Sequence, residues 1–222
     1  MQKTRIEYVD YSWNPIRGIC PIGCDYCYAR RIYQRFKLNS EIRFDEKEFM
    51  AMDRIKKPSR IFVGSTIDMY HPQTSIWVKK IIEKTKDFPL HIFLTLTKLP
   101  HSLLKFQFPK NWWIGSTVIT AHDLQETINV FNKIDNKNIK FISIEPLLYD
   151  VFTEALCDEF FKMSNGNLNW IIIGGLTPHP AHRKEWIDRI IKSAKSNRKH
   201  KIPVFIKANA KYQKIWEFPD VL

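Results

Sequence analysis

Short apolar runs alternate along the chain with stretches whose apolar residues recur at helical spacing. The runs cover residues 60–63, 91–96, 112–115, 140–144, 169–173 and 202–206. Polar or glycine-containing tips follow these runs, and helical periods such as residues 75–86 stand between them. Alternating strands and amphipathic helices are typical of parallel βα units. The pattern predicts an α/β fold, a compact parallel (βα) barrel of about six or seven strands whose closure can be incomplete.

Helix signals support this reading. Thr120 to Asp123 resembles a capping box ahead of a helix with Leu124, Ile128 and Phe131 on its inner face. Further helices are expected from about Tyr28, after Pro100, over residues 153–161 and over residues 186–194. The chain has 222 residues and no glycine- or serine-rich linker, so a single domain spanning residues 1–222 is expected.

Three cysteines near the start of the chain suggest a metal site. Cys20, Cys24 and Cys27 stand with three and then two residues between them. Three thiolates would leave one iron of a 4Fe–4S cluster open, whereas structural zinc sites close four positions with protein ligands. A zinc site completed by a histidine or by Cys157 is the alternative. Cys157 falls in an amphipathic stretch, where a cysteine is usually a small core residue.

This cysteine spacing, with the aromatic Tyr26 just before Cys27, resembles the radical SAM superfamily. The resemblance implies a 4Fe–4S cluster whose open iron binds S-adenosylmethionine (SAM), and reductive cleavage of SAM that starts radical chemistry on a substrate. It also implies a barrel of the radical SAM type and a one-electron reductant of the flavodoxin or ferredoxin type. By their positions at strand tips, the residues expected to bind the cofactor are Tyr26, Gly64, Ser65, Thr66, Asp68, Ser116, Thr117, Glu145, Gly174 and Gly175.

Other readings exist for several of these residues. Asp68 could instead cap a helix or shape a loop, and Ser116 and Thr117 could satisfy backbone groups at a strand end. Gly174 and Gly175 could simply form a tight turn.

Ionisable groups at strand ends are the candidates for chemistry. Glu145 ends an apolar strand, where a charge must find a partner, and Lys98 ends another. Both are assigned a catalytic role. The residues assigned to the substrate are Arg17, His71, Lys207 and Asn209. Trp13, Tyr26, Tyr70 and Trp113 are expected to line the barrel mouth and exclude water if they point inward.

Taken together, the strand tips resemble an uncharacterised radical SAM-like family that is described as a phage-type protein of unknown function. The resemblance runs over nearly the whole chain, through WNPIRGICPIGCDYCYARR, RIFVGSTIDMYHP, FLTLTKLP, WWIGSTV, ISIEPLL, WIIIGGLT and PVFIKAN. Two other classes stay open: a non-catalytic nucleic-acid-binding protein with a zinc-stapled loop, and a cluster-bearing subunit of another enzyme.

Charge suggests the class of substrate. The net charge is +12, and the last third is rich in cations, among them Lys192, Lys195, Arg198 and Lys199. Such a surface suits DNA, RNA or a nucleotide, although a solvated helix face is an equal alternative. The sequence has no apolar leader or membrane-length apolar run, so a cytoplasmic protein without a membrane partner is expected.

Overall fold

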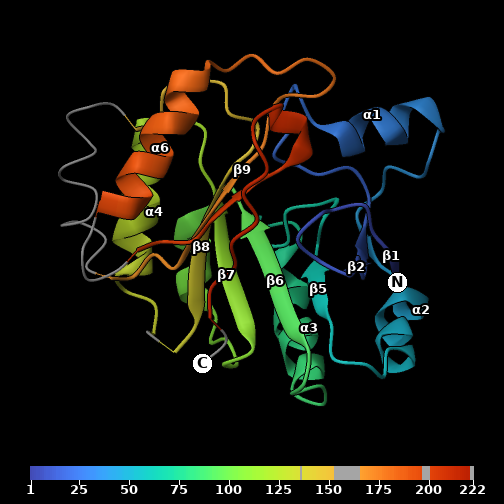
Figure 1. The fold of residues 1–222 in the computed structure, drawn as a ribbon. Helices are drawn as coiled ribbons and strands as arrows, with labels where there is room; N and C mark the ends of the chain where they lie inside the picture. The colour runs from blue at the N-terminus through green and yellow to red at the C-terminus, as the bar shows by residue number, and fades with distance from the viewer. Residues whose placement is uncertain (136, 153–165, 197–200, 221–222) are drawn as a thin grey trace. The chain divides into compact units, whose positions relative to one another are not determined.

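A computed structural model describes residues 1–135, 137–152, 166–196 and 201–220. The fold is α/β, and its mostly parallel central sheet has the strand order β1-β2-β5-β6-β7-β8-β9-β10 (Figure 1). The sheet is not closed, since β1 and β10 stand at the two ends of this order. The predicted α/β class is confirmed. The chain forms two compact units, Met1–Trp113 and Ile114–Leu222.

The first unit contains strands β1 to β6. They are β1 (Gln2–Lys3), β2 (Tyr11–Trp13), β5 (Arg60–Val63) and β6 (Ile92–Thr97), with β3 (Ile16–Arg17) and β4 (Arg43–Phe44) as a separate antiparallel pair. Strand β2 pairs parallel with β5, and β5 pairs parallel with β6, whereas β1 runs antiparallel to β2. The helical segments are α1 (Tyr28–Arg35), α2 (Glu46–Met50), η1 (Ala51–Arg54), η2 (Ser75–Trp77), α3 (Val78–Thr85) and η3 (Pro100–Lys105).

Helix α3 and the strands β5 and β6 supply buried residues to the core of the first unit. Helix α3 lies beside β5 and β6 and buries Val78, Ile81 and Ile82 (Figure 1). Strands β5 and β6 read as nearly continuous apolar runs because their residues are mostly buried, as is typical of parallel strands covered on both faces. The β3–β4 pair was not predicted, since strands of two residues carry no readable alternation.

The second unit continues from β7. Its elements are β7 (Trp112–Thr117, which contains the division between the units), α4 (Ala121–Phe131), β8 (Ile139–Ile144), β9 (Trp170–Ile173), α6 (Lys184–Ser196), β10 (Val204–Ile206) and η4 (Ala208–Ala210). Strands β8, β9 and β10 pair parallel, and α4 and α6 lie alongside the strands of this unit (Figure 1). The helix expected over residues 153–161, with Cys157, lies outside the described residues.

Two features stabilise α4 at its ends. The predicted capping box is confirmed, because the Thr120 hydroxyl accepts from the Asp123 N–H at 3.2 Å and the Asp123 carboxylate accepts from the Thr120 N–H at 2.8 Å. At the other end, the buried Lys140 donates from Nζ to the carbonyls of Phe131 (3.2 Å) and Ile134 (3.0 Å). No helix among the described residues has the length and apolar character needed to cross a membrane.

Candidate functional site

The cysteine loop leads directly into α1. Cys27 is the N-cap residue of the helix, and its N–H donates to the Cys24 carbonyl at 3.1 Å. Gly23 has a φ of +75°, a left-handed conformation that glycine adopts without steric cost, so the loop turns sharply between Cys20 and Cys24. All three cysteines are free thiols and partly exposed. The loop therefore offers three soft donors that an incoming metal can reach.

Cys20 contacts the loop that follows β5. The backbone N–H of Asp68 donates to Sγ of Cys20 at 3.4 Å. Burial raises the pKa of the Cys20 thiol, while this hydrogen bond acts in the opposite direction and lowers the pKa. An N–H donor aimed at sulfur favours the thiolate form, which is the form that binds metals.

The carboxylate of Asp68 is buried and fully used within the protein. Oδ1 accepts from the Tyr70 N–H at 3.0 Å, Oδ2 accepts from the Lys98 N–H at 2.8 Å, and the Thr97 hydroxyl lies 2.9 Å from both oxygens. Burial raises the pKa of Asp68, and the Lys98 and Tyr70 amides oppose that rise. The residue thus fastens the loop after β5 to the end of β6 and presents its N–H to Cys20.

Lys98 reaches the cysteine loop from the end of β6. Its Nζ donates to the Tyr26 hydroxyl at 2.6 Å and lies 5.1 Å from the centroid of the same ring. Tyr26 stands between Cys24 and Cys27, so Lys98 restrains the second half of the loop while Asp68 restrains Cys20. The structure therefore brings together four predicted residues around the cysteines: Tyr26, Asp68, Lys98 and, through the Tyr28 hydroxyl that donates to its carbonyl, Ser65.

The tip after β5 has a tightly defined backbone. Gly64 has a φ of +76°, and a Cβ there would lie 2.5 Å from Cγ of Met69. The Ser65 hydroxyl donates to Asn14 Oδ1 at 3.1 Å, and Thr66 is partly exposed beside it. His71 forms the next turn, where its Nδ1 accepts from the Gln73 N–H at 3.3 Å.

Three of the aromatic residues expected at a barrel mouth are core residues, and one of them, Trp113, is 3% exposed. Trp13 is fully buried and its ring lies 5.8 Å from that of Phe49. Tyr70 is buried too, with Phe106 and Phe108 at ring distances of 5.7 and 6.4 Å. Their large areas stabilise the unit by packing.

Arg17 lies apart from the contacts around the cysteines. Its guanidinium pairs with Asp45 and Glu48, each at 3.3 Å. The Glu48 N–H and the Arg17 guanidinium both lower the pKa of Asp45. Because Arg17 belongs to β3, these contacts tie the β3–β4 pair to Asp45 and Glu48.

The three cysteine thiols are of the chemical type that binds iron–sulfur clusters, although they are not arranged here as a complete metal-binding site. Within the described ranges, no three histidine, cysteine, aspartate or glutamate side chains stand close enough together to hold a metal ion. The three thiols are nevertheless free, partly exposed and on one short loop, and Cys20 receives an N–H hydrogen bond. Thiolates are the usual ligands of iron–sulfur clusters, and hydrogen bonds to sulfur tune them. Cys20, Cys24 and Cys27 are the residues that would hold the group.

The second unit has its own polar group at the strand ends. Lys207, just after β10, forms an ion pair with Glu145, just after β8. Gly174, just after β9, lies under Glu145: a Cβ at position 174 would be 2.8 Å from both Cγ and Cδ of that side chain. Gly174 is therefore needed because Glu145 crosses its backbone to reach Lys207.

Asn209 and Gly175 form a reciprocal pair next to this group. The Asn209 amide accepts from the Gly175 N–H at 3.2 Å and donates to the Gly175 carbonyl at 2.8 Å. Ser116, by contrast, is buried against α4, where its hydroxyl accepts from Thr127 at 3.0 Å, and Thr117 is partly exposed. Of the predicted residues in this unit, Glu145, Gly174, Gly175, Lys207 and Asn209 thus lie around neighbouring strand ends.

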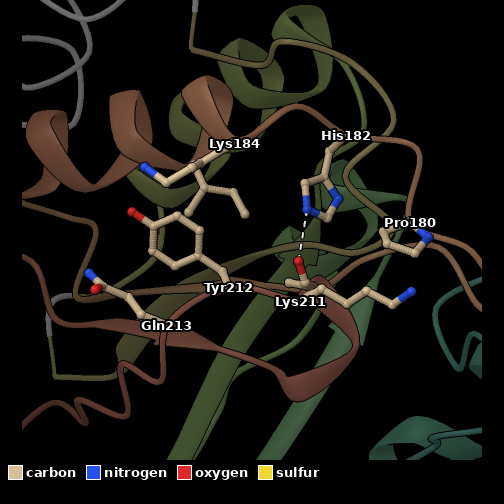
Figure 2. A pocket seen from close by; sticks show the side chains of 8 residues that line it. Pro180, His182, Lys184, Lys211, Tyr212 and Gln213 are labelled. Atoms are coloured by element: carbon tan, nitrogen blue, oxygen red, sulfur yellow. Dashed lines mark hydrogen bonds between the residues drawn. The ribbon is translucent and has the colours of Figure 1, made fainter.

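A pocket of about 480 Å³ lies at the start of α6 (Figure 2). Figure 2 shows His182 and Tyr212 on opposite sides of it, with the ammonium groups of Lys184 and Lys211 pointing in different directions. His182 Nε2 lies 2.9 Å from the Ala210 carbonyl. None of these residues was predicted as a site, because a lysine-rich stretch after an apolar run gives no signal for a pocket.

The positive charge of α6 is partly neutralised. Lys184 pairs with Asp188 at 2.8 Å, Arg189 pairs with Asp150 at 3.0 Å, and Lys195 pairs with Glu217. Lys192 is exposed, and Arg198 and Lys199 lie outside the described residues. The basic excess that is visible in the sequence is therefore smaller on this helix.

Comparison with known proteins gives a family but no activity. No curated protein matches the chain significantly. A family model described as "Protein of unknown function (DUF5131)" matches residues 3–218, which is nearly the whole sequence. The chain therefore belongs to this family of proteins of unknown function.

Proposed function

We propose that this protein is an enzyme of the radical SAM type, in which Cys20, Cys24 and Cys27 hold a 4Fe–4S cluster and SAM is the second cofactor. The observation that carries the proposal is the cysteine loop: three free, partly exposed thiols at this spacing, tied to β5 and β6 through Asp68 and Lys98. When bound, such a cluster supplies the electron that cleaves SAM and starts radical chemistry. We further propose that its sheet forms an incompletely closed (βα) barrel and that the protein is cytoplasmic.

The chain's own residues have defined tasks in this proposal. Asp68 and Lys98 are positioning residues, since they hold Cys20 and Tyr26 respectively. Thr66, which is partly exposed at the tip after β5, offers its backbone and hydroxyl to a ligand. Gly64, Gly174 and Gly175 instead make room for Met69, Glu145 and the Asn209 carbonyl of the protein itself. Glu145 and Lys207 offer a carboxylate and an ammonium group to polar groups of SAM or substrate.

The substrate class that we propose is a nucleic acid or a nucleotide. The net charge of +12 supports it, since a basic protein attracts polyanions. Binding of a DNA or RNA oligomer should weaken with salt, at a log–log slope of about −0.9 per phosphate contact on duplex DNA and about −0.7 on single strands. Lys192→Gln should reduce that slope, while binding that ignores salt would point to a small-molecule or protein substrate.

Anaerobic reconstitution with iron and sulfide tests the function. The expected protein is brown, holds about four irons and cleaves SAM when dithionite is added. Glu145→Gln should keep the iron and lose SAM affinity or turnover, whereas Glu185→Gln on exposed α6 surface should behave as wild type. A colourless protein that holds zinc would favour the stapled nucleic-acid-binding protein. A cluster without SAM cleavage would favour a partner subunit of another enzyme.

A further inference from the structure

Helix α1, the first element after the cysteine loop, exposes a stripe of apolar side chains. Tyr28, Ile32 and Phe36 recur every four residues and so share one face, and they are 51%, 42% and 61% exposed. Leu38, two residues further on, is 48% exposed. Within α1, every residue of which is described, Ala29 is the one buried residue. An exposed apolar stripe of this kind is typical of an interaction surface.

The surroundings of the stripe are strongly basic. Residues 28–43 carry five cationic side chains against the single acid Glu41. Arg31, Arg35 and Lys37 are exposed beside the stripe. Protein interfaces combine an apolar centre with a polar rim, and complementary charge speeds the encounter, so this surface fits an acidic protein. A nucleic acid would leave the aliphatic Ile32 and Leu38 unused, because its affinity comes from phosphate contacts and base stacking.

The stripe begins at the cysteine loop. Cys27 caps α1, and at a rise of about 1.5 Å per residue Ile32 stands about 8 Å along the helix axis from it. Two arginines of the helix also hold the loop, since Arg30 donates to the Cys20 carbonyl at 3.0 Å and Arg31 donates to the Tyr26 carbonyl at 3.2 Å. A protein that docks on α1 therefore sits next to the three thiols.

We infer that α1 and Leu38 are the docking surface for a small acidic one-electron carrier protein. The reduced carrier, a flavin or iron–sulfur protein, loses one electron and the group held by the cysteine loop gains it. This role rests on the proposed function, whereas the docking itself does not. Electron-transfer complexes typically bury less than about 1,200 Å², so this role does not require an extended interface.

Direct binding tests the docking surface without any turnover. Isothermal titration of the purified protein with an acidic flavodoxin at low salt should show binding that weakens as salt is added. The apolar variant Ile32→Ser/Phe36→Ser and the charge variant Arg35→Glu/Lys37→Glu should each bind at least tenfold more weakly. Ile76→Ser/Lys79→Glu, an exposed pair elsewhere in the first unit, should bind as wild type, and the basic carrier cytochrome c should not bind.

The inference is wrong if flavodoxin does not bind at low salt, or if the α1 variants bind flavodoxin as tightly as wild type does. It is also wrong if α1 binds an oligonucleotide or anionic vesicles but not flavodoxin.

A comparison of reductants separates this inference from the proposed function. The α1 variants should cleave SAM at the wild-type rate with dithionite, which needs no docking, and at least tenfold more slowly with reduced flavodoxin. Equal rates with both reductants would contradict the docking surface and leave the function intact. If wild type fails to cleave SAM with dithionite, the proposed function falls, and the binding titration still decides whether α1 docks an acidic protein.

Discussion

The backbone N–H of Asp68 donates a hydrogen bond to Sγ of Cys20, with a distance of 3.4 Å between nitrogen and sulfur. The same residue accepts hydrogen bonds from Thr97 and Lys98 at the end of β6 through its carboxylate. The position of Cys20 therefore depends on a contact between two strand ends, and this relationship leads to the first prediction.

Asp68→Asn should destabilise the protein and uncover Cys20. The amide would place a donor against the Lys98 N–H or the Tyr70 N–H, and a buried group left without its hydrogen bond costs about 1–3 kcal/mol. Urea unfolding measures the stability, and mass spectrometry after iodoacetamide treatment measures alkylation of Cys20 relative to Cys24. The exposed Asp87→Asn is the control. Unchanged stability and an unchanged alkylation ratio would show that Asp68 does not position the loop.

Lys98 and Tyr26 should act as a pair. Lys98→Met removes both the hydrogen bond at 2.6 Å and the ammonium group near the ring, whereas Tyr26→Phe removes the hydrogen bond alone. Each change should speed hydrogen exchange of residues 20–27, and the double variant should add less than the sum, with a coupling of about 0.5–2 kcal/mol in unfolding free energy. Lys98→Arg should partly restore protection. Additive effects would mean that the two side chains are independent.

Gly174→Ala should separate Glu145 from Lys207. The new Cβ would stand 2.8 Å from Cγ and Cδ of Glu145, so that side chain must move, at a cost of about 1–3 kcal/mol for overpacking. Glu145→Ala removes the obstacle, and Gly174→Ala should then cost much less in that background. Chemical unfolding of the four proteins of this cycle gives the answer. An equal cost of Gly174→Ala in both backgrounds would rule out the proposed contact.

Lys140 should make stability depend on alkaline pH. Burial lowers the pKa of Lys140 to about 8, below its ordinary 10.5, so between these values the unfolded chain binds a proton that the folded protein has released. Burial of the charged Lys140 therefore lowers the unfolding free energy by its full amount below pH 8, and this destabilisation disappears as pH rises toward 10.5. The unfolding free energy of wild type relative to Lys140→Met should rise by up to about 1.4 kcal/mol per pH unit in this window. A constant difference from pH 7 to pH 10 would disprove the shift.

The sequence allowed strands β5 to β10 and most helices to be predicted, because each of these buried strands is a continuous apolar run and the capping box before α4 is a local signal. The short strands β1 to β4 carry no such run. The partners of the site residues could not be read in the same way. Asp68 gave equal support to a ligand contact and to a loop contact, and only its fold neighbours Thr97 and Lys98 show how its carboxylate is used. The spacing of Ile32 and Phe36 puts them on one face of the helix that begins at about Tyr28, but spacing alone does not distinguish a buried face from an exposed one; in the structure both side chains are exposed.

The iron content of single-cysteine variants tests the central claim most directly. After anaerobic reconstitution, wild type and Cys157→Ala should each hold about four irons per chain, while Cys20→Ala, Cys24→Ala and Cys27→Ala should each lose the cluster. Circular dichroism should show that all of these proteins stay folded. Loss of the iron in a folded Cys157→Ala protein, or its retention without Cys20, Cys24 or Cys27, would contradict a three-cysteine cluster with an open iron.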